Sequence, residues 1–456
     1  MTSSADSGRG TLRAALAAFP NSSDTEIVLK SNVYVTSALT YPDANKKLKI
    51  RAESTAVIVN TGSGDLALGI YDRNGAELSD FAVLYGGISI ELPSATAGTT
   101  DISVDGVHVY DSDRTGILID VDENAGGNIN VDFTDVVAEG NGSYTGYDMS
   151  GLPNGILVFD DHTGGTLDVN MNGCELNDNR RAGCKLWRKN GDLTVYVFDL
   201  VANGNGSLPP LPGEQLEGSD GLQCEQSGNG DSQVLVSIAQ VHNNTEDGLE
   251  FEELGNGNQS VVLLYVDCEG CLDEGIGVVE EDAGNLQCQF YGCHVADHAG
   301  DEKDSGTVLV ELNDCHLLDR NSDNVTAGDE GCMVRPGGTG NVTVNVDGCT
   351  LSDCGGRGFR MRNDTNGLDT TAVCNIKFDG CVIQNNIIDG IRADIATNQA
   401  ASSIDIRAVD TNGDGMISQQ ETTASVNNYL NNGGQNLDDK GNWTLLNLAT
   451  DPQINN

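Results

Sequence analysis

The sequence predicts an all-β solenoid, because one strand-like segment returns along most of the 456 residues. Each copy opens with glycine and then alternates apolar and variable residues. The copies begin at Gly87, Gly116, Gly155, Gly183, Gly221, Gly248, Gly275, Gly331, Gly358 and Gly390. The positions one and three residues after the glycine are apolar in every copy, as at Ile88 and Ile90. Alternation at period two predicts a strand with one buried face, and a strand repeat of roughly 22–38 residues predicts a solenoid.

A second predicted strand precedes the glycine-initiated strand. Its clearest copies are Leu167–Leu176, Leu286–Val295, Thr307–Leu317, Val342–Leu351 and Cys374–Ile383. A Gly-Cys or Asp-Cys step lies inside them, at Cys174, Cys293, Cys315, Cys349 and Cys381. Asparagine-rich turns follow, and asparagine suits tight bends because it tolerates left-handed backbone. Since no helical period separates the strands, we expect them to stack on their own copies as a parallel β-helix of about 11–12 coils, about 4.8 Å apart.

These repeats resemble the right-handed parallel β-helix of the pectate-lyase-like superfamily over about residues 10–409. The resemblance implies a right-handed coil with an N-terminal cap. It also implies that functional groups lie on the outer face of one sheet, formed by the glycine-initiated strands. The paired-Asp and Gly-His-Gly set of polygalacturonases and the Tyr-Gly-Phe-Asp-Pro-His motif of alginate epimerases are absent from the sequence.

The chain is predicted to divide into an N-terminal segment, a β-helix and a C-terminal segment, at residues 1–30, 31–409 and 410–456. In the first, Gly10–Phe19 forms a capping helix that Pro20 ends. In the second, His298–Gly306 is one of three long insertions between coils. In the third, Leu437–Leu448 folds back as a closing cap.

Residues 410–421 match the EF-hand calcium loop, Asp-Thr-Asn-Gly-Asp-Gly-Met-Ile-Ser-Gln-Gln-Glu. The predicted ligands are Asp410, Asn412, Asp414, the Met416 carbonyl, Ser418 and Glu421, and Gly415 makes the turn. Ile404–Val409 is predicted to be a strand, not the entering helix of an EF-hand, and a second loop is absent. We therefore expect Ca²⁺ to stabilise the C-terminal end of the solenoid without docking a partner.

The chain is strongly acidic, with a formal net charge of −45. Such a surface repels nucleic acid and anionic membranes, so neither is expected as a partner. No segment approaches 18 consecutive apolar residues, so no membrane span is expected. Met1–Gly10 is polar and shows no signal peptide. We expect an extracellular or cell-surface protein, either as a mature chain or as one exported without a signal.

Most of the 13 cysteines fall on inward positions. A free cysteine there acts as a small buried hydrophobe. Disulfides are the alternative in a secreted protein. Cys268 and Cys271 form a lone C-x-x-C, so zinc is not expected.

Outward positions, two and four residues after each glycine, gather one cluster of aromatic and charged residues. Its members are Phe159, Lys185, Trp187, Glu225, Glu250 and Glu252, together with Arg188, which directly follows Trp187. Phe159, Trp187 and Arg188 are predicted to bind substrate. The candidate catalytic residues are Lys185, Glu225, Glu250 and Glu252. Glu250 and Glu252 resemble the calcium-holding pair of alginate and chondroitin lyases. The lysine base of those enzymes is replaced by Gly257, so Lys185 would have to be the base. The alternative is a solvated charged face.

A second cluster is a basic strip, formed by Arg335, Arg360, Arg362 and Arg392. Guanidinium groups suit the carboxylate or sulfate groups of a substrate. The alternative is a ladder of ion pairs with acids such as Asp364 and Asp394.

Two functions remain open. The first is a structural or binding role at a surface, as an adhesin, spike or assembly element stabilised by calcium. Its partners would be a polysaccharide or surface glycan, other surface proteins, or further copies of the chain. The second is a polysaccharide-active enzyme, a uronate lyase acting on the outer face of the glycine-initiated sheet. The missing catalytic motifs favour the first.

Overall fold

The computed structural model describes most of the chain up to residue 318 and shorter stretches beyond it. These residues are 5–22, 25–42, 46–62, 66–93, 98–142, 153–207, 218–272, 274–280, 284–295, 298–303, 308–318, 331–336, 341–352, 357–362, 374–379, 381–384, 389–394, 403–407, 437–439 and 444–446. The chain divides into two compact units. The N-terminal unit comprises Met1–Gly230 with Ala239–Glu246, and the C-terminal unit comprises Asp231–Ile238 with Asp247–Asn456.

The N-terminal unit opens with a short helix and continues almost wholly in strands. Its elements are α1 (Leu12–Ala18), η1 (Phe19–Asn21), β1 (Ile27–Leu29), β2 (Val33–Val35), β3 (Leu39–Tyr41), β4 (Leu48–Asn60), β5 (Leu66–Tyr71), β6 (Ala76–Leu84), β7 (Gly87–Leu92), β8 (Thr99–Asp105), β9 (His108–Tyr110), β10 (Ile117–Val121), β11 (Asn128–Thr134), β12 (Val137–Glu139), β13 (Ile156–Asp160), β14 (Thr166–Asn177), β15 (Cys184–Arg188), β16 (Asp192–Asn203) and β17 (Leu222–Gln226). The residues of β18 (Ser232–His242) are divided between the two units.

The described residues of the C-terminal unit also lie mainly in strands. They form β19 (Leu249–Glu253), β20 (Gln259–Glu269), β21 (Glu274–Glu280), β22 (Leu286–Tyr291), β23 (His294–Val295), β24 (His298–Lys303), β25 (Val308–Asn313), β26 (His316–Leu318), β27 (Cys332–Pro336), β28 (Val342–Asp347), β29 (Thr350–Ser352), β30 (Arg357–Arg362), β31 (Cys374–Asp379), β32 (Val382–Gln384), β33 (Asp389–Asp394), β34 (Ser403–Arg407), β35 (Leu437–Asp439) and β36 (Thr444–Leu446).

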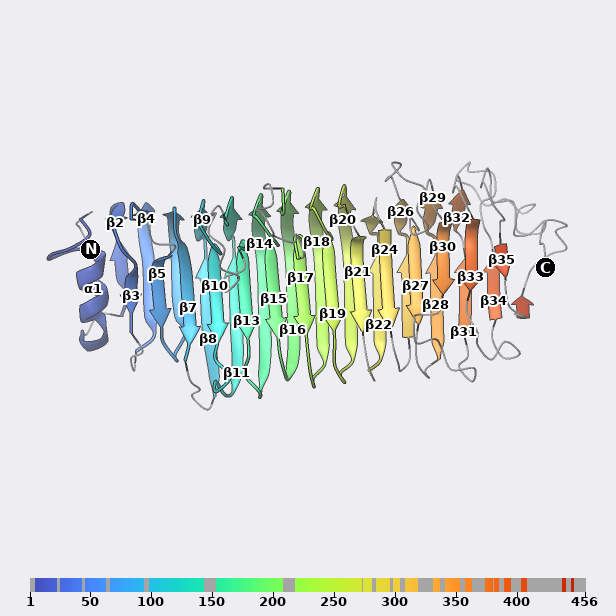
Figure 1. Cartoon of the computed structure of the whole chain (residues 1–456), viewed down its shortest axis with the longest axis horizontal. Coiled ribbons are helices and arrows are strands. Elements are labelled where there is room, and N and C mark those ends of the chain that lie inside the picture. Colours follow the sequence, from blue (N-terminus) through green and yellow to red (C-terminus); the bar gives the residue numbers. More distant parts are fainter. Residues whose placement is uncertain are drawn as a thin grey trace, which may run out of the picture. The chain divides into compact units, whose positions relative to one another are not determined.

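The strands of each unit pair in parallel with their counterparts one coil away (Figure 1). The glycine-initiated strands form one sheet, here the glycine sheet, ordered β3-β5-β7-β10-β13-β15-β17 in the N-terminal unit and β19-β21-β24-β27-β30-β33-β35 in the C-terminal unit. The preceding strands form the second, here the kinked sheet, as in the parallel pairs β8–β11, β11–β14 and β28–β31. This pairing confirms the predicted all-β parallel β-helix.

The apolar columns of the glycine sheet form its inner face, as the alternation predicts. Ile117 pairs with Ile156, and Ile156 pairs with Cys184 on the next coil. All three side chains are fully buried. Each coil therefore adds one apolar layer to a continuous core.

The Gly-Cys and Asp-Cys steps mark the bend of the kinked sheet. The residue before the cysteine has positive φ, +66° at Gly173 and +51° at Asp314. Glycine and aspartate tolerate this left-handed conformation better than most residues. A Cβ at Gly173 would lie 2.5 Å from Oδ1 of Asp135, the bend residue one coil earlier. The bend therefore needs glycine at Gly173 for both its backbone angle and its space.

The cysteines after these bends point into the core. Cys293, Cys315, Cys349 and Cys381 are all buried in the C-terminal unit, and Cys174 is buried in the N-terminal unit. The described cysteines whose side chains are placed are free thiols. Their burial is what the small-hydrophobe interpretation predicts.

Asparagines at one turn of the N-terminal unit form a buried ladder. Nδ2 of Asn141 donates to Oδ1 of Asn179 at 2.9 Å, and Asn179 donates in the same way to Asn205 at 3.0 Å. Asn205 continues the ladder to Asn244 at 2.9 Å. The second Nδ2 hydrogen of Asn179 is donated to the Ala138 carbonyl at 3.0 Å. Stacked amides thus satisfy one another and the turn backbone.

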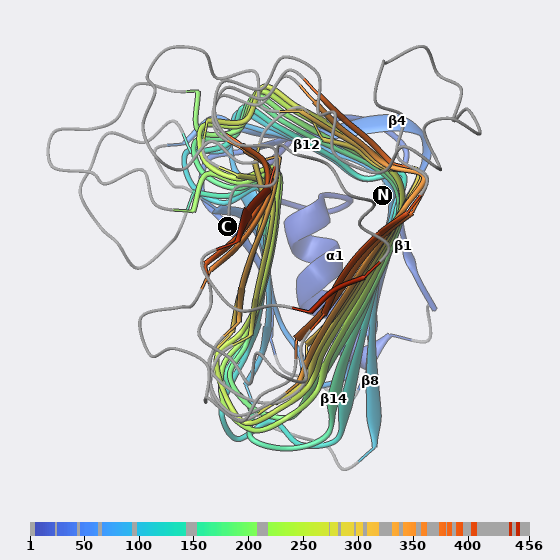
Figure 2. The ribbon, with the colours of Figure 1, turned by 90° about the vertical axis from the view of Figure 1, so that its right-hand side faces the viewer.

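Helix α1 lies at the N-terminal end of its unit, where Figure 2 shows it inside the outline of the coils. The hydroxyl of Thr11 accepts a hydrogen bond from the Ala14 amide and caps the helix. Leu12, Leu16 and Phe19 are buried. The helix predicted over Gly10–Phe19 is therefore present, and it covers apolar surface at this end.

Two regions of the C-terminal unit test predictions about individual segments. The strand expected at Ile404–Val409 is present as β34, and β36 pairs with it. His298–Gly306 is not simply an insertion, because His298–Lys303 forms β24 between β21 and β27. Its sequence, His-Ala-Gly-Asp-Glu-Lys, lacks apolar alternation, so its strand character comes from pairing with its neighbours.

Candidate functional site

An outward column of the glycine sheet brings six side chains into one line in the N-terminal unit. We call it the outer row: Tyr71, Glu91, Asp120, Phe159, Trp187 and Glu225. Each residue is in register with the next, on β5, β7, β10, β13, β15 and β17. All six are partly buried. Period-two alternation explains the line, because the position four after the glycine faces outward on β7, β10, β13, β15 and β17, and Tyr71 pairs with the first of these positions.

The centre of the row is aromatic. The rings of Phe159 and Trp187 are stacked, with centroids 4.3 Å apart and planes inclined by 18°. Nε1 of Trp187 donates to Oε1 of Glu225 at 2.5 Å. Nζ of Lys185 lies 3.0 Å from Oε2 of the same carboxylate. The structure therefore brings Phe159, Lys185, Trp187 and Glu225 together, as the sequence predicts.

The other end of the row is acidic, and its residues were not singled out from the sequence. Glu91 accepts a hydrogen bond from the Ser89 hydroxyl at 3.2 Å. Burial raises the pKa of Glu91, and the nearby Asp120 charge adds to this effect. Burial also raises the pKa of Tyr71, which is hydrogen-bonded to Glu91. The sequence signal that could have identified Glu91 is its outward position in the same column as Phe159.

Asp120 stands between the acidic end and the aromatic centre. It is in register with Glu91 on one side and with Phe159 on the other. Burial raises its pKa, and the charges of Asp122 and Asp161 raise it further. Two adjacent carboxyl groups of the row, Glu91 and Asp120, therefore hold their protons more tightly than exposed acids do.

Arg188 does not belong to this surface. It lies five positions after Gly183, so its side chain points inward, and it is fully buried. Its guanidinium forms an ion pair with Asp160, and it donates to the Gly165 carbonyl at 3.0 Å. His162 completes the cluster, with Nδ1 2.5 Å from Oδ1 of Asp160. A buried, paired arginine cannot contact a bound polysaccharide, which corrects its predicted role.

Glu250 and Glu252 lie on β19, in the C-terminal unit. Both are partly exposed outward residues, in register with Gly277 and Val279 of β21. Each takes part in an interaction within the protein. Their catalytic role stays a prediction.

The arginine strip is also in the C-terminal unit. Arg360 of β30 is in register with Arg392 of β33, and Arg362 is in register with Asp394. Arg360 is partly buried. The side chains of Arg335, Arg362 and Arg392 lie outside the described part of the structure. The register of Arg362 with Asp394 places opposite charges on neighbouring strands, as the ion-pair alternative requires.

The calcium loop at 410–421 lies outside the described residues. Its ligands Asp410, Asn412, Asp414, Met416, Ser418 and Glu421 therefore stay predictions.

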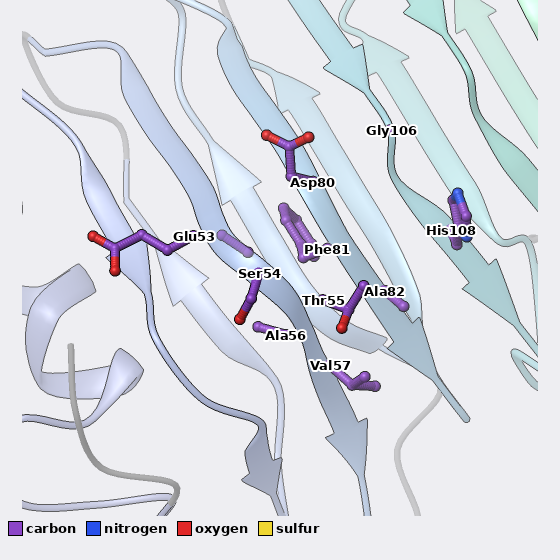
Figure 3. A pocket seen from close by; sticks show the side chains of 11 residues that line it. Glu53, Ser54, Thr55, Ala56, Val57, Asp80, Phe81, Ala82, Gly106 and His108 are labelled. Atoms are coloured by element: carbon purple, nitrogen blue, oxygen red, sulfur yellow. The ribbon is translucent and has the colours of Figure 1, made fainter.

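A hollow of 510 Å³ lies on the outer face of the kinked sheet, between β4 and β6 (Figure 3). It results from a register shift. Arg51 pairs with Ser79 and Ala56 with Phe81, so Ala52–Thr55 stand opposite Asp80 alone. A bulge of this kind bends its strand and leaves local space.

The polar side chains around the hollow either interact with other residues or point away from one another. Glu53 forms an ion pair with Lys30 at 3.1 Å, and His108 lies 3.3 Å from the Tyr110 hydroxyl. Figure 3 shows the carboxylates of Glu53 and Asp80 directed away from one another. Phe81 is 2% exposed. The outer row, and not this hollow, combines an accessible aromatic surface with adjacent polar groups.

Comparison with known proteins does not identify a family for this chain. No protein-family model matches the sequence, and no curated protein matches it significantly. The solved Dettilon tailspike protein (gp208) aligns with a TM-score of 0.36 and 13% identity over 89% of this chain. This chain spans 65% of the length of that protein. Within the described part of the chain, no helix is long and apolar enough to cross a bilayer. The parallel strand pairing within each unit is what establishes the β-helix.

Proposed function

We propose that this chain is a surface or extracellular binding protein whose N-terminal unit holds a polysaccharide along the outer row. The observation that carries the proposal is the row itself, a stacked Phe159–Trp187 pair with carboxyl groups on both sides. In-register strands lie about 4.8 Å apart, close to the length of one sugar residue. A polysaccharide running across the strands would meet one row position at each coil.

The chemistry of the row suits a sugar chain. Sugars present apolar C–H groups and hydroxyl groups in alternation, and ring surfaces with nearby acceptors match both. The partly buried rings of Phe159 and Trp187 supply the apolar strip. Asp120 on one side and Glu225 on the other supply oxygen atoms that accept hydrogen bonds from hydroxyls.

The ion pair of Lys185 with Glu225 favours binding over elimination chemistry. A general base must be within reach of a substrate proton and able to accept it. Here the Lys185 ammonium lies 3.0 Å from a Glu225 carboxylate oxygen. The uronate lyase hypothesis stays an alternative without added support.

Aromatic truncation tests the proposal. We expect Trp187→Ala to weaken binding to a panel of immobilised polysaccharides by about tenfold, or about 1.4 kcal/mol, because the apolar strip is interrupted. Phe159→Ala should weaken the same interactions. The matched control is Tyr196→Ala, which removes an aromatic ring 49% exposed on the kinked sheet of the same unit. Equal binding by the Trp187 and Tyr196 variants, or no binding by the parent chain, would refute the row as a glycan site.

The proposal includes a structural calcium ion at 410–421. An ion that binds the folded loop and not the unfolded chain stabilises the folded protein. Saturating Ca²⁺ should therefore raise the melting temperature of the protein. Glu421→Gln should remove most of this rise, because the twelfth loop position supplies a bidentate ligand. Asp451→Asn is the control, since it removes one acid outside the loop. A rise that survives Glu421→Gln would place the calcium effect elsewhere.

A further inference from the structure

The fixed charges beside the outer row are mainly negative. Lys185 is bound by Glu225, and Lys189 lies 2.5 Å from Asp161. Each of these lysines is therefore matched by an acid. Glu91 and Asp120 add two further carboxyl groups on neighbouring coils, and both are partly buried.

This arrangement disfavours negatively charged ligands more than neutral ones. A uronate or sulfate group beside Asp120 would bring like charges together in a partly desolvated place, where repulsion is poorly screened. A sugar hydroxyl at the same place donates a hydrogen bond to the carboxylate and is not repelled by it. The acidic end thus weakens the binding of anionic polymers and not that of neutral ones.

We infer that the outer row selects an uncharged polysaccharide over a uronate or sulfated one, and that Asp120 is the main residue that sets this preference. The inference rests on the proposed binding function. It separates the row from the lyase hypothesis, which requires a uronate substrate. It also gives the acidic end of the row a role that the aromatic centre cannot supply.

Asp120 is the main determinant because of its position. It is the carboxyl group in register with Phe159, so a sugar that contacts the aromatic strip also reaches Asp120. Glu91 lies one coil farther from the rings and is engaged by Ser89 and Tyr71. Glu225, at the opposite end, is neutralised by Lys185. Replacing Asp120 should therefore change ligand charge preference more than replacing Glu91.

The test compares pairs of polymers that share a backbone and differ in charge. The probes are polygalacturonate and its full methyl ester, and carboxymethyl and hydroxyethyl cellulose, measured by affinity electrophoresis at low salt. We expect the neutral member of a pair to bind about tenfold more tightly. The difference should shrink in 0.5 M NaCl and in Asp120→Asn, which keeps the shape of the side chain. Asp101→Asn, an exposed acid on the kinked sheet, should leave the difference unchanged.

The outcomes separate the inference from the function on which it rests. Equal or tighter binding of the charged member, still lost in Trp187→Ala, would overturn the charge preference and leave the binding site standing. A preference for the neutral member that Asp120→Asn leaves intact would overturn the role of Asp120. Absence of any binding that depends on Trp187, for every probe, would overturn both the preference and the proposed function.

Discussion

Two parts of the interior, a polar part in the N-terminal unit and a thiol column in the C-terminal unit, fill the coils with different chemistry. In the N-terminal unit, the ladder that includes Asn179 and the cluster around Arg188 place polar groups in the core and pair them. In the C-terminal unit, a column of thiols that includes Cys315 and Cys349 lines the core. The same repeating backbone accommodates both. The polar interior depends on each partner, whereas the thiol column depends mainly on volume.

This contrast predicts that substitutions in the polar interior cost much more than those in the thiol column. The polar groups are buried and can be satisfied only by one another and by the neighbouring backbone. The thiols fill space that another small apolar side chain can also fill. Free energies of unfolding of the variants described below test this contrast.

The largest effect is expected for Arg188→Met. It leaves the carboxylate of Asp160 buried beside His162 without its cation, and breaking such a pair costs about 3–5 kcal/mol. Urea unfolding measures the loss. The control is Lys189→Met, which breaks an ion pair with Asp161 in which the lysine is 48% exposed. That pair should contribute about 0–1 kcal/mol. Similar losses for the two variants would show that Arg188 acts as an ordinary surface charge.

Asn179→Ala should cost about 2–4 kcal/mol, because it leaves buried donors and acceptors without partners on both neighbouring coils. Asn141 loses its acceptor and Asn205 loses its donor. Asn170→Ala is the matched control, since this exposed asparagine of β14 bonds only Asp132 across the surface in the described structure. Urea unfolding of both variants checks the difference. A loss below that of the control would mean that the ladder does not stabilise the coils.

Cys349→Ala should cost only about 1 kcal/mol, because a small apolar residue replaces another small apolar residue in the column. Cys349→Ser should cost more, since it buries a hydroxyl group. Thermal unfolding under reducing conditions compares the two. If Cys349→Ala were as costly as Asn179→Ala, the distinction between the two interiors would fail.

The smallest effect is expected for Asp120→Asn, and it is a gain. The pKa of Asp120 is raised in the folded chain, so the folded state binds the proton more tightly than the unfolded state. Stability is therefore lost as pH rises from the unfolded pKa, near 3.8, through the folded one. Asp120→Asn should raise the free energy of unfolding at pH 7 and leave it unchanged at pH 3. A gain that is equal at both pH values would show that the effect does not come from ionisation.

Only part of the candidate site could be predicted from the sequence. Phe159, Lys185, Trp187 and Glu225 were gathered because they occupy outward positions of neighbouring repeats. Arg188 directly follows Trp187, and the alternation places it inside, so its predicted substrate-binding role was wrong. Its burial depends on Asp160 and His162, which come from the preceding coil.

The local sequence is sufficient to specify the coil. Period-two apolar columns, glycine at the strand start and Gly or Asp before the inward cysteine are local requirements, met within a single repeat. Which side chains of different coils meet depends on how the coils stack. The repeats differ in length, so the neighbours of Asp120 follow from strand register and not from any fixed spacing along the chain. Partial burial then changes the chemistry of that carboxyl group, and burial is a property of the stacked coils, not of one repeat.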